Sequence, residues 1–224
     1  VRRFGQMAAR IASQLECDSA SFVNACHEIL PEKGFVPATF PAAFIPDSYE
    51  FYWSAAPENV VRRLLDYRDR FWTEERLAKA CKLGLSKVQV ATLASIIEEE
   101  TAKRDERPLV ARLYLNRLDR GMKLQADPTV KFAVGDFGLR RIRGEHLRVP
   151  SPYNTYLNTG LPPGPIRIPE AASMDAVLDA PLHPYIYMCA REDFSGYHNF
   201  ATNYATHQAN ARRYQAELNR RNIR

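Results

Sequence analysis

Three consecutive glutamates, Glu98 to Glu100, follow an apolar stretch in the segment ASIIEEET at residues 94–101. A carboxyl group at the edge of an apolar helix face loses solvation of its charged form, so it holds its proton closer to neutral pH. Such a carboxyl is what general acid catalysis of glycosidic cleavage requires. The alternative is a plain amphipathic helix with a polar edge, in which none of the three glutamates reacts.

The three glutamates point in different directions when residues 88–102 are drawn as a helix at about 100° per residue. The predicted buried stripe consists of Val90, Leu93, Ala94, Ile97 and Thr101. Glu99 points away from this stripe, so we expect it in solvent. Glu98 lies on a flank of small residues that leaves room for a ligand, which makes it the predicted acid. Glu100 lies on the bulkier flank and is predicted to be structural, paired with a nearby arginine.

Polar and aromatic side chains gather downstream in the segments LQADPT (124–129), PSPYNTY (150–156) and TGLPPGP (159–165). Asn, Gln and Asp side chains can bind sugar hydroxyl and amide groups, and tyrosine faces can pack on sugar rings. Turn formation explains the glycines and prolines of these segments but explains YNTY less well. The segments therefore favour a carbohydrate site.

The elements that must position these residues are mostly helical. Apolar spacing, caps and proline positions predict helices over 6–29 (two short ones), 58–83, 86–102, 108–120, 173–180 and 203–221. YIYMCA (185–190) and GYHNFA (196–201) predict a β-hairpin. Residues 121–170 are predicted to form a long, ordered loop region, because loops of this length inside a domain are usually functional. The predicted fold class is α+β.

Length and charge narrow the class of protein. A chain of 224 residues suits one or two domains with a real core. Its net charge of +5 favours acidic partners such as nucleic acid, anionic lipid or an acidic glycan. No nucleic-acid-binding motif is present, so we expect no nucleic-acid partner.

The cysteines and the ends of the sequence give weaker signals. Four cysteines, at 17, 26, 81 and 189, have neither CxxC nor zinc-site spacing, so we expect scattered buried thiols and no metal site. A Cys17–Cys26 disulfide remains an alternative for a protein outside the cytoplasm. No stretch approaches the roughly 20 apolar residues of a membrane span, and no signal peptide is present. Because the chain begins at Val1 rather than Met, we expect an anchoring or targeting segment before it.

The order of the motifs resembles one known family. ASIIEEET, LYLNRL, LQADPT, YNTY, GLPPGPI and HNF…TNYATH, between Val90 and Tyr214, resemble the endolytic murein transglycosylase family, called MltG or YceG-like. FIPDSYEF (44–51) is an upstream landmark. The resemblance implies part of a LysM-like module at residues 1–43 and a mixed helical and small-sheet catalytic domain at residues 44–224.

The resemblance also implies an activity: lytic cleavage of the β-1,4 bond between N-acetylmuramic acid and N-acetylglucosamine in peptidoglycan. In the implied mechanism Glu98 protonates the glycosidic oxygen and then takes the proton of the muramyl C6 hydroxyl, which attacks C1. The product is a 1,6-anhydro end. One carboxylate serves both steps because the nucleophile belongs to the substrate. No metal or organic cofactor is implied.

Further residues are assigned by the same resemblance. Glu100 is a supporting residue. The predicted substrate-binding residues are Asn116, Gln125, Asp127, Tyr153, Asn154, Thr155, His198 and Asn203. The family usually has Lys at the position of Glu99 and commonly Asn at that of Gln208. Neither departure removes a residue that the mechanism needs.

Two other functions remain open. A hydrolytic muramidase would need a second carboxylate, for which Asp127 and Asp136 are candidates. A non-catalytic peptidoglycan-binding or scaffold protein of the cell-wall machinery would keep the Tyr/Asn loops and tolerate loss of the acid. The resemblance further implies peptidoglycan synthases as partners. It also implies an N-terminal single-pass anchor in the inner (cytoplasmic) membrane, with the catalytic domain in the periplasm or otherwise outside the cytoplasm.

Overall fold

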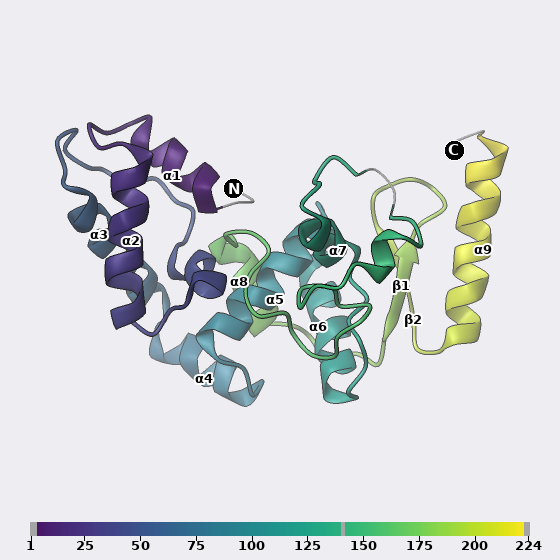
Figure 1. Ribbon diagram of the computed structural model, residues 1–224. Coiled ribbons are helices and arrows are strands. Elements are labelled where there is room, and N and C mark those ends of the chain that lie inside the picture. Colours follow the sequence, from purple (N-terminus) through teal and green to yellow (C-terminus); the bar gives the residue numbers. More distant parts are fainter. Residues whose placement is uncertain (1–3, 140–141, 222–224) are drawn as a thin grey trace.

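The protein is mostly helical, with one small sheet (Figure 1). The structure, a computed structural model, describes residues 4–139 and 142–221, so the outermost residues of both predicted domains lie outside the described residues. The elements in chain order are α1 (Phe4–Ala12), α2 (Ser19–Glu32), the 3₁₀ helix η1 (Pro37–Ala43), α3 (Pro57–Phe71), α4 (Glu74–Lys82), α5 (Lys87–Glu100), α6 (Arg107–Asp119), α7 (Asp127–Val134), the 3₁₀ helix η2 (His146–Arg148), α8 (Ala171–Leu178), β1 (Tyr187–Ala190), β2 (His198–Ala201) and α9 (Tyr204–Arg220). The predicted α+β class is confirmed in this form.

The helices form three groups along the molecule. Figure 1 shows α1, α2 and α3 together at one end, α5, α6 and α8 in the middle, and the hairpin with α9 at the other end. The central helix α5 packs on α8, α6, α7 and η1. A continuous hydrophobic core extends from Met7 in α1 to Leu178 in α8. The site glutamates therefore end a helix that is held from several sides.

Helix α5 begins and ends where its sequence dictates. The Ser86 hydroxyl accepts a hydrogen bond from Gln89 N, and the Gln89 side chain accepts one from Ser86 N, which completes a capping box. Every residue from Val90 to Glu98 is buried, so between its first and last turns α5 is a core helix with no solvated face. Thr101 leaves the helix with extended backbone angles, so Glu98 to Glu100 form its C-terminal turn.

Two regions differ from the predicted elements. The helix predicted over residues 58–83 is two helices, because the chain turns at Trp72 and the Thr73 side chain caps α4. The predicted loop region contains a helix, α7, which begins at Asp127 with Pro128 in its first turn. A helix as short as α7, with eight residues, shows too little repeated apolar spacing to be identified in the sequence.

The hairpin has a simple register. Strands β1 and β2 are antiparallel, with Tyr187 opposite Ala201 and Ala190 opposite His198. Helix α9 follows directly, and the Asn203 side chain caps it by accepting a hydrogen bond from Thr206 N. α9 packs on both strands, which gives the sheet a cover on one face.

The N-terminal residues fold as helices. Residues 4–43 form α1, α2 and η1 and contain no strand, and α2 packs on α3. A LysM-like module is therefore not confirmed, and the division at residue 43 stays a prediction. Asp18 caps α2, because its side chain accepts a hydrogen bond from Ser21 N at 2.7 Å.

Other expectations can be compared directly. All four cysteines are unpaired, so Cys17 and Cys26 form no disulfide, and Cys81 is exposed rather than buried. Across residues 4–139 and 142–221, no single helix is long and apolar enough to cross a membrane. The bent pair α4 and α5, at 79°, meets that criterion only when its two helices are taken together.

Candidate functional site

The last turn of α5 carries three carboxylates where a helix is least suited to hold them. Negative charge at a helix C-terminus opposes the helix dipole. No basic residue occurs in this turn, so cations from elsewhere in the fold must balance Glu98 to Glu100. Places where a sequence departs from such a local preference, here acidic residues at a helix C-terminus, are often functional sites.

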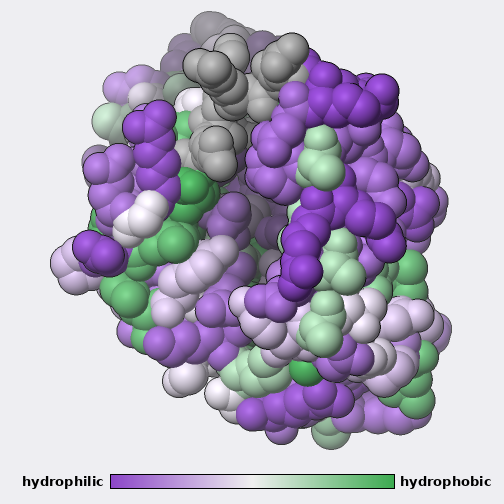
Figure 2. All heavy atoms as spheres, turned by 90° about the vertical axis from the view of Figure 1, so that its right-hand side faces the viewer, coloured by the Kyte–Doolittle hydropathy of each residue, from purple (hydrophilic) through white to green (hydrophobic). Residues whose placement is uncertain are grey.

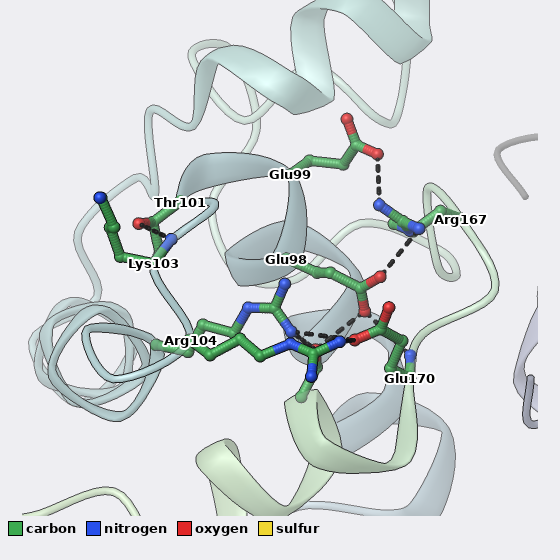
Figure 3. Close-up of polar contacts among 9 residues, drawn as sticks. Glu98, Glu99, Thr101, Lys103, Arg104, Arg167 and Glu170 are labelled. Atoms are coloured by element: carbon green, nitrogen blue, oxygen red, sulfur yellow. Dashed lines mark hydrogen bonds and ion pairs between the residues drawn. The ribbon is translucent and has the colours of Figure 1, made fainter. Parts of the chain in front are cut away.

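Arg167 balances two of the three. Its Nη2 lies 2.8 Å from Glu98 Oε1 and its Nη1 donates to Glu99 Oε1 at 2.8 Å. Figure 3 shows both carboxylates turned toward this one guanidinium. The side chain of Glu99 is only 14% exposed, so the prediction that it lies in solvent is wrong. The helical wheel could not register a distant loop folding back over that face.

Glu98 is held more tightly still. Its side chain is 1% exposed, and its Oε2 accepts hydrogen bonds from Glu170 N at 2.9 Å and from the Ser173 hydroxyl at 2.8 Å. Arg107 donates to the same Ser173 hydroxyl and to Glu170 Oε2. Glu98 therefore joins α5 to the start of α8 and is ionically paired, which is typical of a structural carboxylate.

Glu100 has a different environment. Burial, together with the negative charge of Asp127, raises the pKa of Glu100 to about 7. The charges of His198 and Arg117 and a hydrogen bond from the Tyr114 hydroxyl oppose this rise. The residue keeps some exposure, but its Oε2 is inaccessible to solvent and has no hydrogen-bond partner among the described residues. Within that part of the chain Glu100 also forms no ion pair with any arginine, contrary to the prediction from the wheel.

A second carboxylate stands near Glu100. Asp127 is the first residue of α7 and is exposed. Its Oδ1 accepts a hydrogen bond of 2.6 Å from the Tyr156 hydroxyl, and burial together with this contact raises the pKa of Tyr156. The buried Thr129 and Thr155 hydroxyls lie 2.8 Å apart, and Thr155 also accepts from Ala126 N. This network ties α7 to the YNTY segment, so Asp127 and Tyr156 are held together.

The hairpin brings His198 to the same place. Its Nδ1 lies 2.8 Å from Glu106 Oε2, and its backbone N–H donates to Glu106 Oε1 at 2.7 Å. The Thr101 hydroxyl donates to Glu106 Oε2 at 3.0 Å. The end of α5, the start of α6 and β2 thus converge on one buried carboxylate, and the charge of His198 acts on Glu100.

Three predicted substrate-binding residues have full sets of internal partners. The Asn116 side chain donates to His183 O and Tyr185 O and accepts from Arg112. Asn154 is buried and donates to Leu147 O and Val149 O. Thr155 is buried in the network described above. These contacts support the loops and the hairpin from inside, so the geometry gives these three side chains a structural role.

The remaining predicted residues lie at the surface. Gln125 is exposed and has a positive φ of 51°, while Tyr153 is half-buried with its ring 4.6 Å from that of Phe132. Asn203 is occupied as the cap of α9. Of the predicted set, Asp127 and His198 are the two whose charges act on Glu100.

The sequence prediction missed several residues of this cluster. Tyr114 and Arg117 come from the LYLNRL segment of α6, and both face Glu100. Arg117 is buried and donates to Ile186 O and Leu124 O. Their spacing of three residues on one helix was the available signal. Nothing local in the sequence marked Glu106, because its partners are 5 and 92 residues away.

The molecular surface is hollowed on the side of these elements. Figure 2 views the molecule from the α9 side and shows a furrow with mostly hydrophilic residues along its right side and a group of hydrophobic residues at its left. Among the described residues, no group of three or more His, Cys, Asp or Glu side chains is arranged to hold a metal ion.

Comparisons with known proteins agree with the motif order. The sequence profile described as the YceG-like family matches residues 1–213. A protein of Bacillus subtilis named endolytic murein transglycosylase is 34% identical over 164 residues, which cover 73% of this chain and 43% of that protein. A protein of the same name from Streptococcus pneumoniae is 28% identical over 179 residues, covering 78% of this chain and 32% of that protein.

A solved structure is also similar. A crystal structure of a yceG-like protein from Listeria monocytogenes superimposes with a TM-score of 0.76 at 28% identity, covering 92% of this chain and 72% of the other. The chain spans less than half the length of the two named relatives.

Proposed function

Because this chain belongs to the YceG-like family, we propose that it is a peptidoglycan lytic transglycosylase in which Glu100 is the acid and then the base. Two relatives of the chain carry the name endolytic murein transglycosylase. The observation that carries the residue assignment is the carboxyl of Glu100, which burial keeps protonated up to about pH 7 and which no described arginine neutralises.

The choice between Glu98 and Glu100 follows from their partners. A general acid must hold a proton and reach the substrate. Glu98 is paired with Arg167 and accepts two further hydrogen bonds, so both of its carboxyl oxygens are occupied by partners within the protein. Glu100 has a raised pKa of about 7. We therefore assign the acid to Glu100, while the assignment to Glu98 stays a prediction from the sequence.

The proposed reaction needs one carboxyl group. Glu100 gives its proton to the oxygen that links N-acetylmuramic acid to N-acetylglucosamine, and the bond from that oxygen to muramyl C1 breaks. The Glu100 carboxylate then takes the proton of the muramyl C6 hydroxyl as its oxygen bonds to C1. Glu100 ends protonated, the products are a new N-acetylglucosamine end and a 1,6-anhydro muramyl end, and no water is consumed.

The neighbours of Glu100 fit this cycle. Asp127 helps to keep the proton on Glu100 before the first step, whereas Arg117 and His198 favour the carboxylate needed for the second. Opposed influences of this kind hold the group near neutrality, where acid and base roles are both accessible. The nearness of Asp127 also favours one alternative, a hydrolase in which Asp127 activates water.

Mass spectrometry of the products tests the proposal. Purified peptidoglycan is digested with the wild type and with Glu100→Gln, Glu98→Gln and Glu99→Gln, and the muramyl ends are identified. We expect anhydro ends from the wild type and a loss of about 10²- to 10⁴-fold in their rate of formation for Glu100→Gln. Glu99→Gln should leave the rate within a few-fold.

Each other outcome is informative. Reducing ends would mean hydrolysis and would assign water activation to Asp127 or Asp136. Loss of activity in Glu98→Gln alone, with its folding intact, would return the acid to Glu98. Glycan binding without cleavage by any variant would contradict the enzymatic assignment and favour a binding or scaffold protein.

The remaining expectations are part of the same proposal. Peptidoglycan strands would be the substrate, in line with the names of the relatives. An N-terminal membrane anchor, a location of the catalytic domain outside the cytoplasm, synthase partners and a LysM-like module stay predictions of the family resemblance. Fractionation of cells that produce the full-length natural protein would test the anchor and the location.

A further inference from the structure

The buried carboxylate of Glu106 joins three elements beside the proposed acid. Its side chain is 2% exposed. Oε1 accepts the His198 backbone N–H at 2.7 Å, and Oε2 accepts the Thr101 hydroxyl at 3.0 Å and lies 2.8 Å from His198 Nδ1. Burial pushes the pKa of Glu106 up, but hydrogen bonds from the His198 side chain and backbone outweigh it and hold that pKa below its usual range. Glu106 is therefore a carboxylate, which only accepts hydrogen bonds.

The state of the Glu106 carboxylate determines the tautomer of His198. Since Glu106 Oε2 can only accept, His198 Nδ1 must carry the hydrogen in their 2.8 Å contact. His198 Nε2 then has a lone pair in the neutral ring and a proton in the imidazolium. Among the described residues Nε2 has no hydrogen-bond partner, and it is not closed off from solvent. Nε2 is therefore the ring nitrogen that Glu106 leaves unoccupied.

Thr101 links the same carboxylate to Glu100. Thr101 is the residue directly after Glu100, is 3% exposed and ends α5. Its hydroxyl donates to Glu106 and accepts from Lys103 N at 3.1 Å. Figure 3 shows Thr101 and Arg167 on opposite sides of the end of α5. Contacts of these two residues therefore hold the last turn of the helix from both sides. The position of His198 relative to Glu100 thus depends on one buried side chain.

We propose that Glu106 is a positioning residue that holds His198 beside Glu100 through the Nδ1–H hydrogen bond, so that the imidazolium, which also carries a proton on Nε2, stabilises the Glu100 carboxylate left after proton transfer. The idea rests on the proposed function for its catalytic meaning. An aligned carboxylate and imidazole commonly fix the tautomer and ring orientation in this way.

The charged groups around both partners are few. Within the described residues, the pKa of Glu100 is affected by four groups from three elements: Asp127 from α7, Tyr114 and Arg117 from α6, and His198 from β2.

In the described part of the chain, two charged side chains contact His198. Glu106 bonds the ring, and Arg191 donates to the backbone oxygen at 3.2 Å. Asp127 opposes the carboxylate form of Glu100, while Arg117 supports it together with His198. Arginine side chains stay charged in proteins, whereas histidine side chains can gain or lose a proton, so His198 is the supporting group whose removal is tested below.

Histidine NMR tests the geometry without any assay of activity. The ¹⁵N shifts of His198 in the wild type should identify the Nδ1–H tautomer above its titration. The ¹³C carboxyl titration of Glu100 should move to higher pH in His198→Gln, because the opposing cation is gone. An Nε2–H tautomer in the wild type, or an unchanged Glu100 titration in His198→Gln, would overturn the proposal even if the protein proves inactive.

Kinetics test the effect on the reaction with uncrosslinked glycan strands as substrate. We expect Glu106→Gln and His198→Gln each to lower kcat roughly tenfold, which corresponds to a shift of about one unit in the pKa of Glu100. Both variants should also move the alkaline limb of kcat/KM to higher pH. If Glu106 acts through His198, the double variant should be no worse than His198→Gln alone. If the losses in kcat of the two single variants add in the double variant, Glu106 does not act through His198.

A matched control separates positioning from general support of the hairpin. Glu192 also bonds a β2 side chain, accepting from Asn199 at 2.8 Å, but it is not among the groups that shift the pKa of Glu100 most. Glu192→Gln should leave kcat, the alkaline limb and the Glu100 titration unchanged. Equal changes in this control would mean that any loosening of the hairpin suffices, which contradicts a specific role for Glu106. If Glu106→Gln does not fold, the wild-type spectra and His198→Gln still decide the question.

Discussion

A single turn of helix gives adjacent glutamates opposite physical states. Glu98 shares Arg167 with Glu99 and accepts two more hydrogen bonds. Burial and the charge of Asp127 raise the pKa of Glu100 to about 7, against the opposing charges of His198 and Arg117. At the residue scale, the partners rather than the side-chain type decide which glutamate can react.

Removing the Glu100 carboxyl should stabilise the fold at alkaline pH. The folded-state pKa of about 7 lies above the usual value of 4.5, so ionisation of Glu100 weakens folding as pH rises from about 4.5 to 7. At pH 8 we expect Glu100→Gln to raise the free energy of unfolding by about 1 to 3 kcal/mol. Below pH 4.5 the difference should vanish. Urea unfolding of both proteins at pH 4 and pH 8 measures this, and equal stability at pH 8 would contradict the raised pKa.

Neutralising Asp127 should move the pH dependence of activity. The proposed first step needs protonated Glu100, so under this proposal kcat/KM should fall as pH rises through about 7. The negative charge of Asp127 helps to raise the pKa of Glu100, so Asp127→Asn should shift this alkaline limb to lower pH. Asp136→Asn is the control, because Asp136 is exposed and is not among the groups that shift the pKa of Glu100 most. A limb that stays in place in Asp127→Asn would remove Asp127 from the site.

At the scale of elements, the loop after η2 holds the end of α5 in place. Ile166 N donates to the Ser95 hydroxyl at 3.0 Å, and Arg167 reaches Glu98 and Glu99 one turn later. Its GLPPGP segment lies directly against η1, where Gly164 touches the backbone of Ala38. The segment is rigid because its prolines restrict the chain, and it is close-packed because Gly164 has no side chain.

The Gly164 contact yields a test. A Cβ on residue 164 would lie 1.9 Å from Ala38 O, and backbone cannot move aside as a flexible side chain can. We expect Gly164→Ala to lower the free energy of unfolding by about 2 to 4 kcal/mol and to reduce activity by displacing Arg167. Gly144→Ala, where a Cβ meets nothing within 4 Å, is the matched control for thermal unfolding and activity. Similar unfolding temperatures for both variants would show that the loop is not close-packed.

At the scale of the whole molecule, the site lies between a stable core and a lightly attached end. Every residue of α5 from Val90 to Glu98 is buried, and the continuous core runs from α1 to α8. In α9 the single buried residue among those described is Asn210, and the hairpin contributes only partly buried side chains to that core. Sites that must admit a polymer are commonly built next to elements of low local stability.

Amide hydrogen exchange should reveal this difference. Amides of α5 should exchange only through global unfolding, while those of α9 should exchange at least about 100-fold faster through local opening. Native-state exchange followed by mass spectrometry of peptides measures both helices in one experiment. Equal protection of α5 and α9 would mean that the C-terminal end is part of the same cooperative unit.

The sequence alone determined the family, the α+β class and most helices, because these follow from ordered motifs, caps and apolar spacing. Ser86 caps the helix that its position predicts. Caps and apolar spacing involve residues close together in the chain, so they can be recognised in the amino-acid sequence alone.

Only the tertiary structure decided which glutamate is free to hold a proton. Arg167 lies about 68 residues from its glutamate partners, and Glu106 meets His198 across 92 residues. A helical wheel contains neither contact. The prediction from the wheel therefore placed Glu99 in solvent and paired Glu100 with an arginine. Burial and ion pairing set the pKa of a carboxyl, and both depend on chain segments that come together only in the folded protein.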